Sequence, residues 1–220
     1  MIGDSELYLI LINAFLGAFP ILACALTSYL KVSLVFSLMR QALGGIGVPS
    51  NLLVFVFSSL VSMQIMSPVL TKVQEEFGQI ELTELKNNSV SQLQSLGAQL
   101  APALAPLKRF LFLNSRFDFN RDTFSSQLTN EQQLNNLSWR ELVLQFAIAE
   151  FQEGLIIGLL LITPFILIDF VISNILLALG LNMLSPTVVC LPIKIMLMVM
   201  GGVFDTIQKI LIGSYAGIVN

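Results

Sequence analysis

Two acidic side chains in an apolar stretch have the clearest capacity for chemistry in this chain. Glu150 and Glu153 are three positions apart, so on a helix they lie on one face. Paired carboxylates can carry out acid–base chemistry or bind a cation. The sequence has no histidine, and no nucleophile–base set or further ligand cluster accompanies the pair. We therefore expect neither an enzyme nor a metal or other cofactor.

A third carboxylate, Asp169, stands among Pro, Phe, Ile and Leu in residues 164–170. A charge in lipid is costly and indicates a functional or paired residue. One interpretation is a proton relay, as in an ion- or proton-coupled transporter or channel subunit. The other is a structural ion pair with Lys194, Lys31 or Arg40 inside an assembly. Because the segment has no second acid or histidine chain, the ion pair is favoured.

Two basic residues, Lys31 and Arg40, are the only charges between residues 7 and 71. They are nine positions apart, about 2.5 helical turns, and so point to roughly opposite sides of a helix. Either they anchor helix ends at the membrane interface, or they pair with carboxylates of neighbouring subunits.

A bend is expected between residues 180 and 186, where Gly180 and Pro186 enclose a short segment containing Met183. Glycine and proline break helices. Methionine is soft and fills irregular gaps, so on a bend it can pack around something that changes shape.

Composition places the chain among membrane proteins. It has 220 residues, of which 55% are hydrophobic and 11% charged, whereas soluble domains carry about 25% charged residues. The net charge of −3 excludes a basic surface for nucleic acid. Cys24 and Cys190 both lie in apolar runs and are expected to be small buried hydrophobes.

The distribution of charge predicts an all-α membrane protein with two hydrophobic helical hairpins, four long kinked helices and a mainly helical hydrophilic insert. The expected divisions are an N-terminal hairpin at 1–71, the insert at 72–141 and a C-terminal hairpin at 142–220. The long apolar runs are 7–30, 51–71, 141–177 and 188–212, and Ser50 or Asn51 is a candidate cap for the helix of the second run. Within the insert we expect helices at 72–77, 81–100 and 107–114 and a loop at 120–136.

Orientation follows from the excess of positive charge on cytoplasmic connections. The connection that carries Lys31 and Arg40 is expected to be cytoplasmic, with the N-terminus, the insert and the C-terminus outside. The first residues include Asp4 and Glu6 but no basic residue. The run 7–30 is therefore interpreted as a retained membrane helix rather than a cleaved leader.

Motifs in both halves of the chain resemble the FliP/SctR family, core export-apparatus proteins of bacterial type III secretion systems. In the first half they are residues 27–31, 40–44, 48–51 and 66–69. In the second half they are Glu150, Gly158, 164–165, 168–169, 178–180, Met183, 185–186 and 191–194. The insert matches weakly apart from residues 105–110. The unprocessed-looking start favours an injectisome-type member over a flagellar one.

The resemblance implies a role in an assembly. In this family several copies, usually five, join small S-type hairpin subunits and one T-type subunit in a conical export gate. The gate belongs to the bacterial inner membrane, and its assembled core is raised toward the periplasm. Exported unfolded proteins pass through its centre. Further export-apparatus proteins and membrane lipids are expected partners, and nucleic acid is not. No phosphate-binding loop occurs, so energy must come from a partner.

The resemblance also implies site residues. The family narrows its pore with a ring of three methionines after an Ala-Leu-Gly motif, and the corresponding positions here are Leu181, Asn182 and Met183. We expect these three residues to line a constriction. Candidate intersubunit polar contacts are Lys31, Arg40, Glu150, Glu153, Asp169 and Lys194. The alternative function is the ion- or proton-coupled transporter or channel subunit that uses Asp169.

Overall fold

The computed structural model describes residues 4–44, 49–78, 102–115, 138–181 and 183–215. All regular structure in these residues is helical, which confirms the all-α class. The helices are α1 (Asp4–Leu26), α2 (Tyr29–Ala42), α3 (Asn51–Gly78), α5 (Ala105–Asn114), α8 (Trp139–Ala178), α9 (Pro186–Met200) and α10 (Val203–Gly213). The expected helix 81–100 and loop 120–136 lie outside the described residues.

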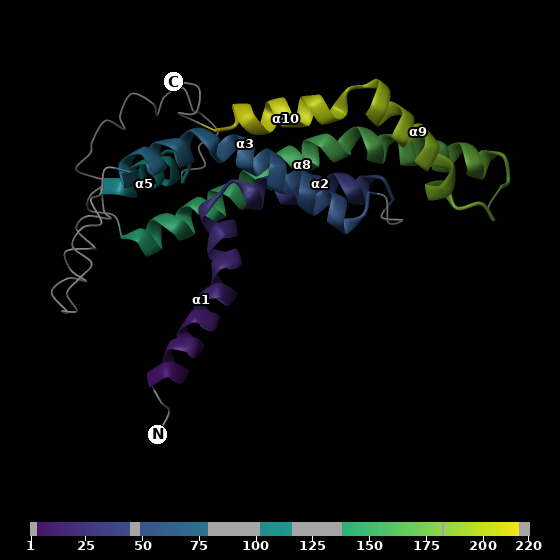
Figure 1. Ribbon diagram of the computed structural model, residues 1–220. Coiled ribbons are helices and arrows are strands. Elements are labelled where there is room, and N and C mark those ends of the chain that lie inside the picture. The colour runs from purple at the N-terminus through teal and green to yellow at the C-terminus, as the bar shows by residue number, and fades with distance from the viewer. Residues whose placement is uncertain (1–3, 45–48, 79–101, 116–137, 182, 216–220) are drawn as a thin grey trace.

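The first apolar run, expected as one helix over residues 7–30, is interrupted at residues 27–28, and the segment expected as a connection forms a second helix. α1 ends at Leu26, and α2 begins at Tyr29 in a different direction, so that α1 projects away from the rest of the molecule (Figure 1). Thr27 Oγ1 accepts a hydrogen bond from the Tyr29 N–H (3.4 Å) and donates one to the Ala23 carbonyl (2.7 Å). Hydroxyl side chains compete in this way with helical backbone bonds.

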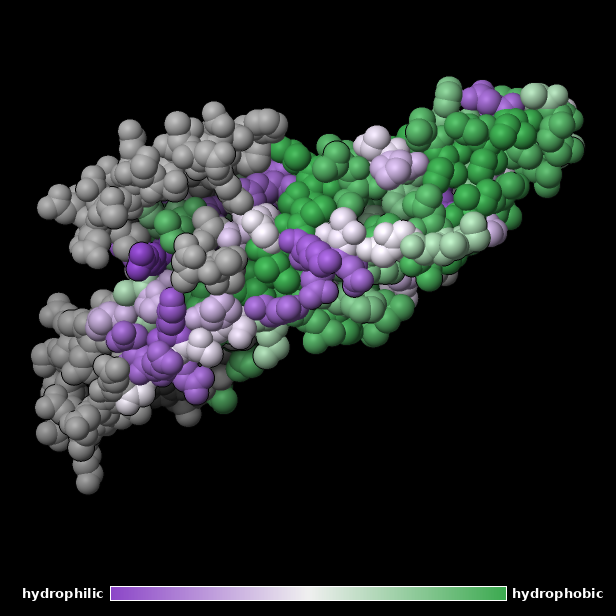
Figure 2. Space-filling model, turned by 90° about the horizontal axis from the view of Figure 1, so that it is seen from above, coloured by the Kyte–Doolittle hydropathy of each residue, from purple (hydrophilic) through white to green (hydrophobic). Residues whose placement is uncertain are grey.

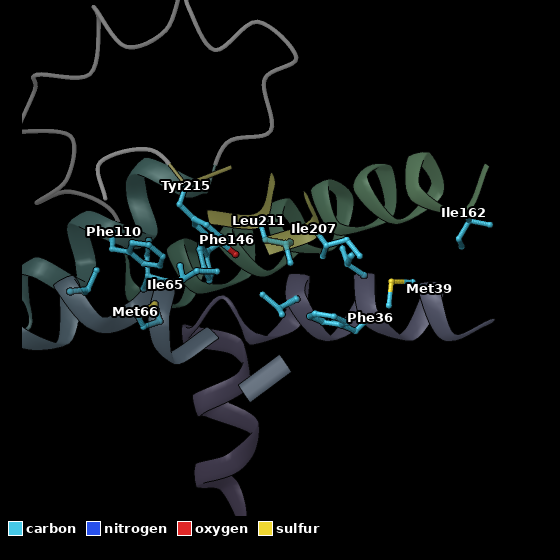
Figure 3. Packing of buried hydrophobic residues seen from close by; sticks show 14 of the residues in the cluster. Phe36, Met39, Ile65, Met66, Phe110, Phe146, Ile162, Ile207, Leu211 and Tyr215 are labelled. Atoms are coloured by element: carbon cyan, nitrogen blue, oxygen red, sulfur yellow. The ribbon is translucent and has the colours of Figure 1, made fainter. Parts of the chain in front are cut away.

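α2 lies at the centre of the packed body, mainly against α8 and also against α3. Its buried positions recur at the helical repeat and are Lys31, Val32, Val35, Phe36, Met39 and Ala42. Figure 3 shows Phe36 and Met39 on this inner face. Ser50, which the sequence suggested as a cap for α3, accepts a hydrogen bond from the Leu53 N–H at 3.3 Å.

α8 is one continuous helix of 40 residues that passes through Pro164. Its buried residues recur about every fourth position and form a stripe along the helix: Leu142, Phe146, Glu150, Gly154, Gly158, Ile162 and Phe165. Positions four apart share a helix face. The face of α8 that packs against α2 therefore carries Glu150, Gly154 and Gly158 in successive turns.

Two of the described helices, α3 and α8, are long and apolar enough to cross a membrane, and α9 with α10 makes a third if the bent pair counts as one span. Many large apolar side chains lie exposed on the C-terminal half of α8, among them Leu160, Leu167 and Phe170. The hydrophobic colour covers the α8–α9 end of the surface in Figure 2. Exposed apolar area of this extent needs lipid or protein around it.

Two segments of the expected hydrophilic insert belong to the same packed body as the apolar helices. α3 continues through Pro68 to Gly78, so residues 72–77 extend the second apolar helix rather than forming a separate one. The predicted helix 107–114 is confirmed as α5, with Pro106 in its first turn. α5 packs against α3 and α8 and joins the same hydrophobic core through Phe110 and Leu111.

The last apolar run also consists of two helices. α9 and α10 meet at an angle of 61° across Gly201 and Gly202. Gly202 has φ +57°, a left-handed conformation that only glycine adopts without strain. The bend lays α10 along the body (Figure 1), whereas a single helix was expected over 188–212.

Candidate functional site

A buried ion cluster joins α2 to α8. The Nζ atom of Lys31 lies 3.0 Å from Glu150 Oε1 and 2.7 Å from Glu153 Oε2. The side chains of Lys31 and Glu150 are each 1% exposed, and that of Glu153 is 16% exposed. Since Glu150 and Glu153 share one face of α8, both reach the same cation. The two carboxylates therefore serve as counter-ions to Lys31.

The residues that follow α10 complete this cluster. Lys31 Nζ donates to Ser214 Oγ at 3.2 Å and lies 3.8 Å from the centre of the Tyr215 ring. The Tyr215 hydroxyl donates to Glu150 Oε2 at 2.6 Å. A cation over an aromatic face and a charge-assisted hydrogen bond both strengthen when they are shielded from water. The chain end is thus bound to both members of the ion pair.

Tyr215 also connects the cluster to α5. Its ring stacks on Phe110 at 5.8 Å between ring centres, and Phe110 in turn packs against Phe146 at 5.7 Å (Figure 3). Burial raises the pKa of the Tyr215 phenol well above its usual value, and the neighbouring Glu150 raises it further. The phenol therefore stays protonated and keeps its role as hydrogen-bond donor.

Two glycines bring α2 and α8 close together beside the cluster. A Cβ atom at Gly154 would lie 3.3 Å from the Lys31 backbone, and one at Gly158 would collide with the Leu38 side chain. Small residues four apart let helices approach closely. The short separation places the Lys31 side chain within reach of Glu150 and Glu153.

A second ion pair joins α9 to α8 and α2. Lys194 Nζ lies 2.6 Å from Asp169 Oδ2 and donates to the Ala42 carbonyl at 2.5 Å. The Lys194 side chain is 1% exposed and that of Asp169 is 42% exposed. Of the three cations that were considered as partners for Asp169, it is Lys194 that pairs with it within the chain.

Arg40 lies away from both clusters. At the end of α2, its guanidinium donates to Asn51 Oδ1 at the start of α3. Arg40 and Lys31 are both on α2 rather than on a connection between helices, and Lys31 is buried. The charge bias used to infer the orientation therefore does not come from an exposed loop, and the orientation stays a prediction.

The three residues expected to form a constriction belong to the connection between α8 and α9, far from both ion clusters. Leu181 is 43% exposed and Met183 is fully exposed. Asn182 lies outside the described residues. Gly180, with φ +71°, ends α8 and turns the chain into this connection (Figure 1). In the single chain the Met183 side chain is therefore fully accessible and that of Leu181 partly so, and their role in a constriction stays a prediction.

The geometry brings five of the six predicted polar residues into two clusters, but each cluster forms within one chain. Their proposed contacts between subunits stay a prediction. Sequence reasoning missed Tyr215 and Ser214, for which no local pattern exists. It named Gly158 only as a family motif residue and did not use the four-residue spacing of Gly154 and Gly158, which signals close helix packing. In the described part of the chain no group of three or more His, Cys, Asp or Glu could hold a metal ion.

Together the long apolar helices and the internally neutralised charges define a helical membrane protein that is built to be surrounded by lipid and protein. The FliP family profile matches residues 12–211, and the chain belongs to this family. The family assignment confirms the resemblance inferred from the motifs.

Curated relatives cover almost the whole chain. Yop proteins translocation protein R of Yersinia pestis is 32% identical over 96% of this chain and 97% of its own length. Virulence protein YscR of Salmonella typhimurium is 32% identical over 97% and 98%. Harpin secretion protein HrcR of Erwinia amylovora is 31% identical over 84% and 87%. These are injectisome-type relatives, so the chain is a membrane-embedded component of a type III secretion apparatus that associates with other secretion proteins.

Proposed function

We propose that this protein is a structural subunit of the inner-membrane export gate of a type III secretion system and forms part of the channel through which unfolded proteins leave the cell. It performs no catalysis. The observation that carries the proposal is the connection between α8 and α9, where a fully exposed methionine stands at the tip of an apolar helical arm. In a ring of subunits such tips can converge on one axis and narrow the passage.

The proposed assembly contains several copies of this chain, with five as the expected number, together with small S-type hairpin subunits and one T-type subunit. The exposed apolar surface of α8 and α9 supports this arrangement, because a large apolar surface is stable only against lipid or another subunit. The gate resides in the inner membrane with its core raised toward the periplasm.

The Asp169–Lys194 contact favours a gate subunit over a proton- or ion-coupled transporter. A carboxylate that carries protons or ions must change its charge or its ligand during each cycle. Asp169 is instead paired at 2.6 Å with a cation that also binds the end of α2. Such a contact holds three helices in register.

The proposed function is tested at the connection itself. Leu181, Asn182 and Met183 are replaced together by Ala in the assembled apparatus, and ion leakage and protein secretion are measured. A constriction predicts increased leakage or altered secretion, with normal amounts of assembled complex. The matched control is Met200→Ala, because Met200 is an apolar side chain 79% exposed at the end of α9 and outside the connection. Unchanged leakage and secretion in the triple variant would contradict the proposal.

A further inference from the structure

The pair α9–α10 has the composition of one membrane span but the shape of two helices. α9 ends at Met200, α10 begins at Val203, and the two meet at 61°. Taken together they are long and apolar enough to cross a membrane. Gly202, in its left-handed conformation, makes the bend. Glycine also fits a continuous helix, at only a small cost relative to alanine.

α10 is held against the body by a small number of side chains. Ile207 and Leu211 are fully buried, and Gln208 Nε2 donates to Gln64 Oε1 of α3 at 2.9 Å. Beyond the end of α10, Tyr215 reaches the buried Lys31 and Glu150. The polar contact furthest from the hinge is therefore also the most deeply buried one.

We propose that Tyr215, seated on the Lys31–Glu150 pair, is a latch that keeps α10 folded back, and that its release lets α9 and α10 straighten at Gly202 into one membrane-spanning helix. The folded-back form buries Ile207 and Leu211 in the protein. The extended form presents the same apolar side chains to lipid. This inference concerns a conformational change of the single chain and does not depend on the export role.

The arrangement of charges makes release possible without leaving a bare charge. When Tyr215 departs, Lys31 still has both Glu150 and Glu153 within ion-pair distance. The hydroxyl bond to Glu150, the Ser214 contact and the ring contacts are lost, together with the interaction of the phenol with Ser28. Breaking a buried ion pair would be far more costly than losing one hydrogen bond to it. The latch can therefore open while α2 and α8 remain joined.

The test measures the distance between α3 and α10 with spin labels in lipid nanodiscs. Labels are attached at Met63→Cys and Lys209→Cys, both exposed positions beside the Gln64–Gln208 contact, after Cys24→Ala and Cys190→Ala remove the native thiols. Lys209 is seven residues from Gly202, about 10 Å along a helix. Straightening through 61° therefore lengthens the separation by up to about 10 Å.

Two substitutions separately change the hinge at Gly202 and the latch at Tyr215. Gly202→Ala penalises the left-handed bend but favours a continuous helix, and is expected to shift the equilibrium roughly five- to thirty-fold toward the long separation. Tyr215→Phe keeps the ring contacts but removes the hydroxyl bond to Glu150, and is expected to shift it about tenfold in the same direction. Gly213→Ala is the control, because Gly213 has an ordinary helical φ and open space around it.

The expected result is a short separation in the parent and in Gly213→Ala, and a growing population of the long separation in the other two variants. A single short separation in both Gly202→Ala and Tyr215→Phe would overturn the proposal. So would a predominantly long separation in the parent, because the latch would then not hold α10. If Tyr215→Phe lengthened the label separation but Gly202→Ala did not, Gly202 would not be the hinge, and the proposal would be overturned.

Discussion

Lys31 on α2 and Glu150 on α8 form an ion pair of 3.0 Å whose side chains are both almost completely buried. Glu153 and Tyr215 add a second counter-ion and a hydroxyl donor, so Lys31 has two carboxylate partners and both oxygens of Glu150 are bonded. Buried charges of this kind are expensive to unpair. The cluster therefore determines how the first and last thirds of the chain are joined.

Removing the cation is expected to be the most damaging single change in the cluster. Lys31→Met leaves two carboxylates facing each other in a buried space, and breaking such a pair costs about 3–5 kcal/mol. The measurement is the thermal unfolding of the purified protein in detergent. Lys72→Met, at an exposed position on α3, should leave the unfolding temperature nearly unchanged. Partial recovery is expected in Lys31→Met combined with Glu150→Leu. No difference between Lys31→Met and Lys72→Met would contradict the assignment.

The two glycines of α8 should respond differently to the same substitution. Gly158→Ala meets the Leu38 side chain, so Leu38→Ala is expected to restore most of the lost stability. Gly154→Ala meets the Leu34 side chain at 3.1 Å and the backbone of Lys31 at 3.3 Å, and truncation of Leu38 relieves neither contact. Overpacking of this kind costs about 1–3 kcal/mol. A double-mutant cycle on the free energy of unfolding distinguishes the two cases, with Gly213→Ala as the unhindered control. Equal rescue of both variants by Leu38→Ala would show that the helices do not pack as described.

The second ion pair predicts an asymmetry between its partners. Asp169→Asn leaves Lys194, which is 1% exposed, without its counter-ion. Lys194→Met leaves Asp169, which is 42% exposed in the single chain and so is less enclosed by the protein than Lys194 is. Because an unpaired charge costs most where it is most buried, Asp169→Asn should reduce the yield of folded protein and of assembled complex more than Lys194→Met does. Size-exclusion chromatography in detergent gives both yields. Normal assembly of Asp169→Asn with abolished ion flux would instead support a transporter.

Tyr215 predicts a loss of stability in alkali. Its pKa is raised in the folded protein by burial and by Glu150, so the folded state holds the phenolic proton more tightly than the unfolded chain. The corresponding stability is fully present below the unfolded pKa of about 10 and declines as the pH rises above it. Tyr215→Phe lacks this titration. The difference in unfolding temperature between parent and variant is therefore expected to shrink above about pH 10. A difference that stays constant from neutral pH to pH 11 would argue against a buried phenol beside Glu150.

Several parts of the fold could be predicted from local pattern alone. The apolar runs gave α3 and α8, the Pro-bounded segment gave α5, and Ser50 marked the start of α3. The breaks at residues 27–28 and 201–202 were missed. At the first, hydroxyl groups redirect the backbone in a stretch with no strong breaker. At the second, two adjacent glycines permit a bend but do not require one.

The sequence by itself determined that this is an all-α membrane protein that resembles the FliP family, and it favoured pairing of the charges within the apolar helices. Hydrophobic length and composition carry the class, because apolar runs long enough to cross a membrane are read directly from the chain, whereas the motifs in both halves carry the family. Only the tertiary structure decided the partners: Lys31 with Glu150 and Glu153, and Lys194 with Asp169. Spacing along one helix determines which residues share a face, but not which face of another helix meets it. That choice depends on the close approach at Gly154 and Gly158 and on the return of the chain to Tyr215.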